Sequence, residues 1–386
     1  MKKIFLISIL SLITFTNLLA QTDSRVITTA VPFMLVSGDA RASAMGDMGV
    51  ATSADAFSQY WNPAKYIKMD SKLGFALSYT PYLSELVNDI KIINLTYYNK
   101  LNDRSAFALS MKYFGLGEIQ LTTDSGADNG IVSPNEFYID GSYALKLSED
   151  FSMAVTMRYI LSDLKLGTGN EDASAASTFA VDISGYYESQ PIDFTDFDGR
   201  IRLGFNLQNL GPKIKYYKSD DGDFLPTNLK LGAGFDFITD EYNTIGVTFE
   251  TNKLLVPTPP VRDSGGNIID GKDDKVNWMT GIFQSFSDAP GGFSEELKEF
   301  QWSLGTEYTY LDAFSLRAGY FHESEIKGNR RYFTVGAGIK YNYMVIDLSY
   351  LFSTGQLRSP LDNTMRFSLT FNIDEFANSA GTEDDK

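Results

Sequence analysis

The chain has 386 residues and a formal net charge of -16, with 33 Lys and Arg against 49 Asp and Glu. This acidic balance argues against nucleic acid as a partner, and the lack of cysteine excludes disulfides, thiol chemistry and a lipid-anchored cysteine. Aromatic residues make up 14% of the chain, which suits belts of Tyr and Phe at two membrane interfaces.

The first twenty residues have the composition of a secretory signal. Lys2 and Lys3 supply a positive start, an apolar centre follows, and Ala20 before Gln21 marks a plausible cleavage site. An N-terminal membrane anchor is the alternative, but the apolar centre is short for one. No later stretch is apolar enough to form a membrane helix. We therefore expect an exported chain without membrane helices.

Residues 21–70 do not alternate apolar and polar side chains. Residues 38–50 are rich in small side chains, and Tyr60-Trp61-Asn62-Pro63-Ala64 follows. Small side chains permit close packing, so we predict a hatch that lies inside a barrel formed by the rest of the chain, or across its periplasmic mouth. A free periplasmic arm is the alternative, because hydrophobic periodicity says little about such a segment.

Residues 71–373 alternate apolar and polar side chains with a period of two. In residues 151–161 every second residue is large and apolar, and the residues between them include Ser152, Thr156 and Arg158. A soluble sandwich alternates too, but repetition over about 300 residues, with aromatics at segment ends, is typical of a membrane-spanning barrel. We predict fourteen strands, at residues 72–80, 90–99, 103–114, 136–147, 151–163, 177–188, 199–210, 228–238, 243–253, 300–311, 313–322, 331–341, 343–353 and 364–373.

The connections between these strands separate into two kinds, as a barrel requires. Bacterial barrels have an even number of strands, short periplasmic turns and long outer loops, and we expect both termini on the periplasmic side. The fold class is therefore an all-β, antiparallel, up-and-down transmembrane barrel of about fourteen strands. Its parts are a signal peptide at 1–20, a hatch at 21–70, a barrel at 71–373 and an acidic C-terminal tail at 374–386.

Predicted inward positions carry charges of both signs. They include Asp140, Arg158, Glu307 and Arg366. A selective pore more often shows one dominant sign, so we expect interior ion pairs that fix the hatch rather than an ion pathway.

The longest outer loop, residues 254–299, contains a segment that also fits a fifteenth strand. A strand at residues 276–286 would make the strand number odd. Its apolar residues recur at three- and four-residue steps, and Asp274 is placed to cap a helix. We predict an amphipathic helix there and a second short helix at residues 294–300.

The apolar face of this helix is a candidate partner-binding stripe. It is formed by Trp278, Met279, Ile282, Phe283 and Phe286. Packing onto the barrel rim or into the lipid headgroups is the alternative.

The sequence offers no set of residues for catalysis. His322 is the single histidine, and Ser324 would share a strand face with it, but nothing marks a third triad member or an oxyanion hole. The acidic run at 220–223 lacks the spacing of a calcium loop, and the Gly-x-Gly at 232–234 lies inside a strand. We predict no catalytic, cofactor-binding or metal site, and hence no enzyme.

Several motifs resemble the PorV/PorQ branch of the FadL-like outer-membrane barrels. The N-terminal part carries Arg41, then Met45-Gly46-Asp47-Met48-Gly49-Val50-Ala51, Asp55-Ala56-Phe57 and Trp61-Asn62-Pro63-Ala64. The similarity continues at residues 304–308, 316–320 and 366–370, and it covers nearly the whole mature chain. Within this branch, the long helical loop with residues 278–286 and 288–296 is most similar to PorV-like (LptO-like) members. We take the hatch motif to comprise Arg41, Met45, Gly46, Trp61, Asn62 and Pro63.

The resemblance implies a fourteen-stranded barrel in the bacterial outer membrane and a role in type IX secretion. Implied partners are a large translocon barrel, the C-terminal domains of secreted cargo, a surface attachment complex and the surrounding lipid. Such a protein would shuttle cargo and needs no conduction. The alternative is a FadL-like transporter for hydrophobic small molecules, which predicts a continuous apolar groove in the lumen or hatch.

Overall fold

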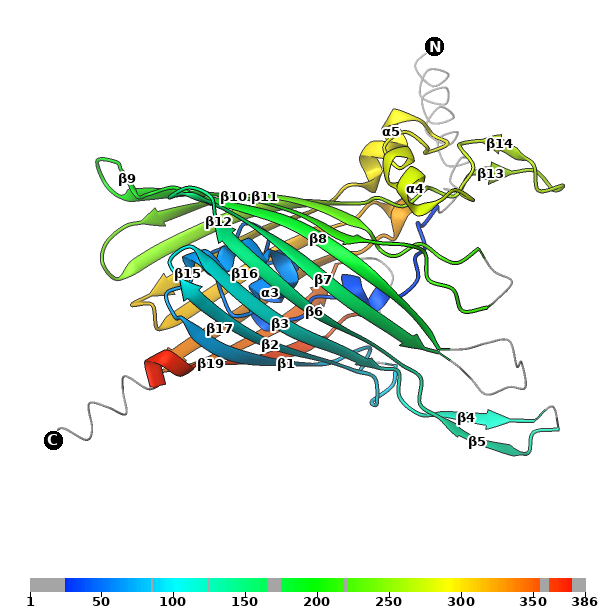
Figure 1. Ribbon diagram of the computed structural model, residues 1–386, viewed down its shortest axis with the longest axis horizontal. Coiled ribbons are helices and arrows are strands. Elements are labelled where there is room, and N and C mark those ends of the chain that lie inside the picture. The colour runs from blue at the N-terminus through cyan, green and yellow to red at the C-terminus, as the bar shows by residue number, and fades with distance from the viewer. Residues whose placement is uncertain are drawn as a thin grey trace, which may run out of the picture.

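The computed structural model describes residues 25–84, 86–123, 125–164, 175–217, 221–354 and 361–376. The predicted signal peptide and residues 377–386 of the predicted tail lie outside these ranges. Fourteen antiparallel strands close into a barrel (Figure 1). Among the described residues, no helix has the length and the hydropathy that crossing a membrane would need.

The barrel strands follow one another in sequence order, and the last pairs with the first to close the wall. They are β1 (Leu73–Pro81), β2 (Lys91–Asn102), β3 (Ser105–Gly115), β6 (Asn135–Lys146), β7 (Phe151–Asp163), β8 (Ala176–Glu188), β10 (Asp198–Leu210), β11 (Asn228–Ile238), β12 (Asn243–Leu254), β15 (Gln301–Tyr310), β16 (Phe314–His322), β17 (Arg331–Tyr341), β18 (Met344–Ser353) and β19 (Met365–Asn372). The predicted fourteen-stranded barrel is confirmed. The predicted ranges 151–163, 228–238 and 331–341 coincide with β7, β11 and β17.

The alternation in the sequence separates a lipid face from a lumen face. On β7, Val155 and Met157 are 51% and 68% exposed, whereas Thr156 and Arg158 are buried. The large apolar side chains therefore point outward into the bilayer, and the small or charged ones point inward. Arg158 is neutralised inside by Asp140 on β6 and Asp182 on β8, at 2.8 and 2.9 Å.

Short turns and long loops lie at opposite ends of the barrel (Figure 1). The short-turn end is periplasmic and carries the small strand β9 (Ile192–Asp193). The other end, which faces outward from the cell, carries two projecting hairpins. One is β4 (Ile119–Thr122) with β5 (Asp128–Val132), and the other is β13 (Val261–Arg262) with β14 (Ile268–Asp270).

The expectation that both ends of the mature chain lie on the periplasmic side is wrong for the first described residues. The backbone N–H of Arg25 donates to the carbonyl of Ile326 in an outer loop. The last described residues lie beside the periplasmic turns, at the other end of the barrel (Figure 1). An even number of strands requires only that β1 begins on the side where β19 ends. The residues before β1 can still run through the lumen to the other side.

Residues 25–70 lie within the barrel and its outer opening. They contain four short helical elements and no strand. The first twelve of them, residues 25–36, are called the N-terminal segment below. The four elements are η2 (Pro32–Leu35), α2 (Ala40–Ala44), α3 (Ser58–Trp61) and η3 (Pro63–Lys68). Small side chains let this backbone approach the wall, and an added Cβ at Gly319 of β16 would lie 2.1 Å from the carbonyl carbon of Met45.

Candidate docking surface and hatch

The loop after β12 begins by burying an apolar stretch of chain against the outer rim. Leu255 and Val256 are 3% and 2% exposed, and Thr258 is fully buried. The loop then forms the β13–β14 hairpin and three short helical elements. These are α4 (Trp278–Gln284), α5 (Phe293–Glu296) and η4 (Leu297–Glu299). Residues 276–286 therefore form no strand.

Helix α4 is capped and anchored on one side. The side-chain oxygen of Asn277 accepts a hydrogen bond from the backbone N–H of Thr280 at 2.9 Å, so Asn277 is the N-cap. The prediction that Asp274 caps the helix is wrong, because Asp274 pairs with Arg262 at 2.6 Å instead. An added Cβ at Gly281 would lie 2.7 Å from the ring of Phe224, so this face of α4 lies close against the barrel rim.

The opposite side of the helices presents large apolar side chains to solvent. Met279, Phe283 and Phe286 are 55%, 75% and 47% exposed, and Phe293 and Leu297 are 78% and 55% exposed. We call these five residues the outer apolar patch. In Figure 1, α4 and α5 lie next to each other at the outer end, beside the β13–β14 hairpin.

The predicted stripe is divided between the two faces of α4. Met279, Phe283 and Phe286 are exposed, whereas Trp278 and Ile282 are half-buried. Phe293 and Leu297 were missed, because an element as short as α5 gives no readable period. The Gly291-Gly292 pair before Phe293 was the available signal, since glycine often marks a turn that presents the next residue.

Buried ion pairs hold α5 and η4 onto the barrel wall. Lys253 near the end of β12 contacts Glu296 at 3.2 Å and Glu299 at 2.5 Å. Lys327, in the loop between β16 and β17, lies 2.8 Å from both Glu295 and Glu299. Removing one partner of such a pair leaves an uncompensated buried charge, so these contacts fix the part of the outer apolar patch that Phe293 and Leu297 form.

Three of the loop's carboxylates lie close together. Oxygens of Asp288, Glu296 and Glu299 are within 4.8 Å of one another, a spacing compatible with a metal ion. The ammonium of Lys253 already lies on two of them. Burial, together with the neighbouring carboxylates of Glu296 and Glu299, raises the pKa of Asp288 to about 6.

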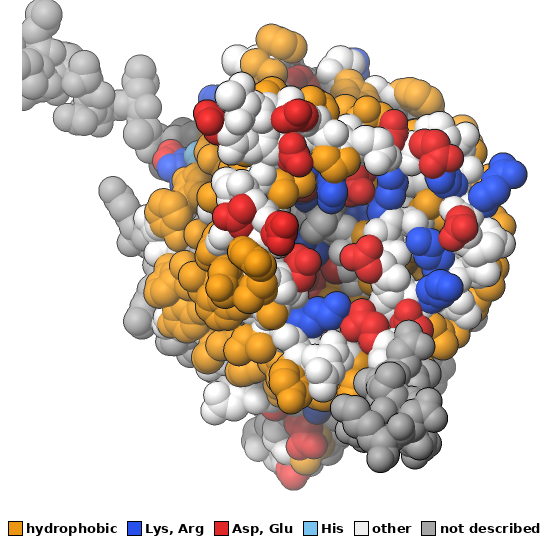
Figure 2. Space-filling view, turned by 90° about the vertical axis from the view of Figure 1, so that its left-hand side faces the viewer, with side chains coloured by type: hydrophobic (Ala, Val, Ile, Leu, Met, Phe, Trp, Pro, Cys, Tyr) orange, Lys and Arg blue, Asp and Glu red, His pale blue; other side chains and the backbone are white. Residues whose placement is uncertain are grey.

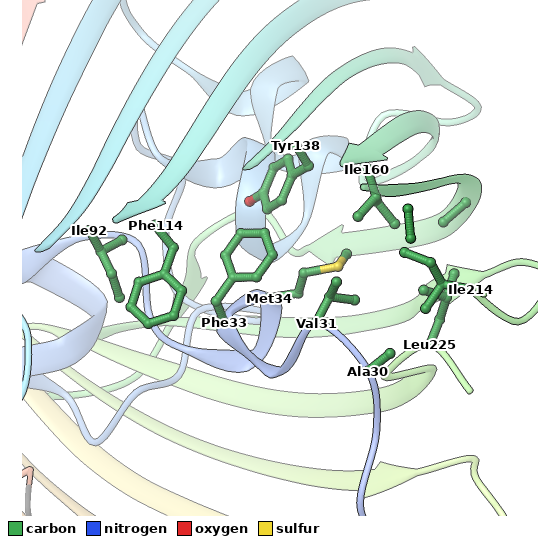
Figure 3. Close-up of a cluster of buried hydrophobic side chains, with 12 residues drawn as sticks. Ala30, Val31, Phe33, Met34, Ile92, Phe114, Tyr138, Ile160, Ile214 and Leu225 are labelled. Carbon is green, nitrogen blue, oxygen red and sulfur yellow. The ribbon is translucent and has the colours of Figure 1, made fainter. Parts of the chain in front are cut away.

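The N-terminal segment fills the outer half of the lumen with apolar side chains. Ala30, Val31, Phe33 and Met34 are buried in a cluster with residues from the barrel wall and an outer loop (Figure 3). Wall and loop partners are Ile92, Phe114, Tyr138, Ile160, Ala176, Ala180, Ile214 and Leu225. The ring of Phe33 stacks on Phe114 with 5.9 Å between centroids.

Below this cluster, charged hatch residues are tied to the wall. The guanidinium of Arg41 contacts Glu307 on β15 and Asp55 in the hatch, each at 2.7 Å. Asp39 accepts from the indole N–H of Trp61 at 2.7 Å and caps α2 through the backbone N–H of Ala42. Neither Asp39 nor Asp55 belonged to the predicted hatch motif.

The remaining motif residues make backbone contacts. The Asn62 side chain donates to the carbonyls of Val50 and Gly185, both at 2.9 Å. Pro63 follows the end of α3 and begins η3, as expected of a residue that disfavours helix before it. Met45 is buried, and Gly46 has a φ of 84°, which favours glycine, against the backbone of Tyr320.

The periplasmic mouth below the hatch is polar. A cavity of about 760 Å³ opens at this end and is lined by charges of both signs, among them Arg41, Glu188, Asp236, Glu307 and Arg317. Figure 2 shows acidic and basic side chains around the hollow. Expected interior ion pairs are present, for example Arg317 with Asp347 at 2.6 Å.

His322 lies at the end of β16 and is placed by aromatic neighbours. Its ring stacks on Trp302 with 5.0 Å between centroids, and its Nδ1 lies 3.4 Å from the hydroxyl of Tyr320. This set of contacts is a structural one and supplies no nucleophile–base pair.

A protein-family model described as "Type IX secretion system protein PorV" matches residues 19–261. No curated protein sequence matches the chain. Solved structures of similar fold include a mutant of the monoaromatic hydrocarbon channel TodX, with 14% identity, coverage of 87% of this chain and 99% of that one, and a TM-score of 0.51.

Two further structures are similar over most of the chain. The toluene transporter TbuX of Ralstonia pickettii has 12% identity and a TM-score of 0.45, and the match covers 88% of this chain and 97% of the transporter chain. A FadL homologue of Pseudomonas aeruginosa has 13% identity, with 90% and 99% covered and a TM-score of 0.45. At these identities the likeness concerns the fold alone.

Proposed function

The chain belongs to the PorV family of type IX secretion proteins and is an outer-membrane component of that system, and on this premise we propose a docking and cargo-transfer role. Its outer end docks on the large translocon barrel and receives the C-terminal domain of secreted cargo. It then passes the cargo to the surface attachment complex. The FadL-like barrel anchors this outer end in lipid.

The outer apolar patch is the observation that carries the proposal. Large apolar side chains that stay exposed on a fixed surface mark a protein or lipid contact. Aromatic residues are the usual anchors of protein interfaces, and the patch contains Phe283, Phe286 and Phe293. Because buried ion pairs hold α5 and η4, binding a partner would require little ordering of the loop.

The filled lumen supports docking rather than conduction. The N-terminal segment occupies the apolar outer half, and charged residues line the cavity at the periplasmic end. A transporter for hydrophobic molecules would need a continuous apolar groove, whereas here a packed apolar cluster is followed by a cavity lined with charged side chains. The barrel fold is compatible with that alternative, but no further observation favours it.

One genetic experiment separates the two functions. We would delete the gene and measure, in the same strain, the amount of cargo at the cell surface and the uptake of a hydrophobic compound such as toluene. The proposal predicts that surface cargo is lost and uptake is unchanged. If secretion stays intact and uptake of the compound is lost, the docking proposal is wrong and the transporter alternative is favoured. A plasmid copy of the wild-type chain, carrying a C-terminal affinity tag, serves as the control and recovers the partners from detergent-solubilised membranes.

A further inference from the structure

The first described residues reach the outer surface beside the outer apolar patch. The guanidinium of Arg25 donates two hydrogen bonds to the carboxylate of Glu295 on α5, at 2.9 and 2.8 Å. Its backbone N–H donates to the carbonyl of Ile326 at 2.9 Å. Val26 is 41% exposed, so the start of the N-terminal segment lies at the surface rather than under the loops.

The N-terminal segment is anchored at its other end inside the barrel. The backbone N–H of Ala30 donates to the carbonyl of Phe224, and Val31, Phe33 and Met34 are buried (Figure 3). Val31 has a φ of 45°, a left-handed conformation that a β-branched residue adopts only where its surroundings hold it. The segment therefore has a fixed path from the lumen to the surface.

Glu295 is the junction between this segment and the outer apolar patch. It lies on α5 between Phe293 and Leu297, and its side chain is 3% exposed. Besides Arg25 it accepts from Lys327 at 2.8 Å and from the backbone N–H of Gly291 at 2.8 Å. Burial alone would raise its pKa, but the hydrogen bonds from Arg25, Lys327 and Gly291 lower the pKa of Glu295 to about 2.

We propose that the N-terminal segment is a structural part of the extracellular docking surface, and that Arg25 is a positioning residue that holds α5 so that Phe293 and Leu297 face the partner. This inference rests on the proposed function for the identity of the partner, the large translocon barrel of the secretion system. It adds that the chain from Arg25 onward runs from the outer surface into the barrel lumen. The partner therefore meets a surface built from residues 25 and 26 together with the longest outer loop.

The path of the segment is tested by labelling intact cells. The chain has no cysteine, so Val26→Cys gives one reactive site for a membrane-impermeant maleimide. Ile269→Cys on the outer hairpin is the accessible control, and Glu241→Cys in a periplasmic turn is the shielded one. Val26→Cys should label on intact cells as Ile269→Cys does, while Glu241→Cys labels only after the outer membrane is permeabilised. If Val26→Cys also requires permeabilisation, the proposal is overturned.

The positioning role is tested on partner recovery. Arg25→Gln should lower the amount of translocon that co-purifies with the tagged protein by about two- to fivefold, the effect of losing one partly exposed ion pair. Arg25→Lys should restore part of the recovery because it keeps the charge. Arg262→Gln removes an arginine of the same outer end whose ion pairs lie outside α5, and it should leave recovery unchanged. Wild-type recovery for Arg25→Gln would overturn the proposal.

A third variant separates this inference from the proposed function. In it, Phe283, Phe286 and Phe293 are all changed to Ala. If that variant loses the partner and Arg25→Gln does not, the positioning role fails and the docking function stands. If both keep the partner at the wild-type level in a correctly folded barrel, both fail. Heat-modifiable migration in gels checks the fold of each variant.

Discussion

The guanidinium of Arg41 in the hatch and the carboxylate of Glu307 on β15 form a two-point ion pair, at 3.0 and 2.7 Å, although 266 residues separate them in the chain. Glu307 also accepts from Arg317 at 2.6 Å, and Arg41 also donates to Asp55. The side chains of Arg41 and Glu307 are each 12% exposed and line the periplasmic cavity, so the network is partly screened from bulk water. It makes the hatch and the wall one folding unit, because neither side can separate without exposing unpaired charge in the lumen.

Arg41→Met should loosen the hatch. Removing one partner of a fully buried ion pair typically destabilises by about 3–5 kcal/mol, and a smaller loss is expected here because the pair lines a cavity open to water and Glu307 keeps Arg317. We expect a protease that cleaves after aromatic residues to cut the variant at Phe57, Tyr60 or Trp61, whereas the natively folded wild type resists cleavage between Asp39 and Lys65.

The matched control for that prediction is Arg262→Met, which breaks an ion pair between partly exposed side chains of an outer hairpin. Such pairs contribute about 0–1 kcal/mol, so its hatch should stay protected. If the protease cleaves the natively folded wild type freely between Asp39 and Lys65, these residues form a loose arm and not a packed hatch.

Leu369→Arg should destabilise the barrel from its lipid face. Leu369 lies opposite Leu77 on β1 and Ile346 on β18, whose side chains are 40% and 55% exposed toward the bilayer. A charge near the bilayer midplane costs about 2–4 kcal/mol. The inward neighbour Thr370 should tolerate Thr370→Ser. Denaturant unfolding in lipid vesicles measures both, and equal tolerance at the two sites would show that the register is wrong.

Protonation of Asp288 should stabilise the outer loop. Because burial raises the pKa of Asp288 to about 6, above its ordinary value, the folded loop binds a proton more tightly than the unfolded loop does. The penalty for burying the charge is therefore fully present above pH 6 and is relieved as the pH falls toward 5. Glu295 stays ionised throughout this window, because its pKa is about 2.

Amide hydrogen exchange in residues 285–300, corrected for intrinsic rates, measures this effect. We expect stronger protection at pH 5 than at pH 7 in the wild type. Asp288→Asn has no charge to bury, so its protection should be the same at both values. Weaker protection at pH 5 than at pH 7 in the wild type would contradict the raised pKa of Asp288.

The strands were predictable because each separates two environments. A period of two in residues such as 151–161 follows directly from lipid on one face and lumen on the other, so β7 could be placed to the residue. The amphipathic part of α4 was predictable for the same reason, with a period of three to four. In both cases the information is local in the chain.

The path of the N-terminal segment and the contacts of the hatch were not predictable from period. Arg41 finds Glu307, and Arg25 finds Glu295, only once the barrel has closed. Phe293 escaped prediction because α5 spans a single turn. Long-range pairs and short elements leave no periodic trace, and these are the features that shape the outer surface.

The most direct test of the docking role uses the three exposed aromatic residues of the outer apolar patch. A strain carrying only the chain with Phe283, Phe286 and Phe293 changed to Ala should show normal barrel folding. Surface cargo and co-purified translocon should both fall by at least about tenfold, since truncating one anchor of an interface can cost 2 kcal/mol or more. Tyr341→Ala, which removes a 73% exposed aromatic at the periplasmic end, should leave both at the wild-type level. If the triple variant folds and both quantities also stay at the wild-type level, the outer apolar patch is not the docking surface.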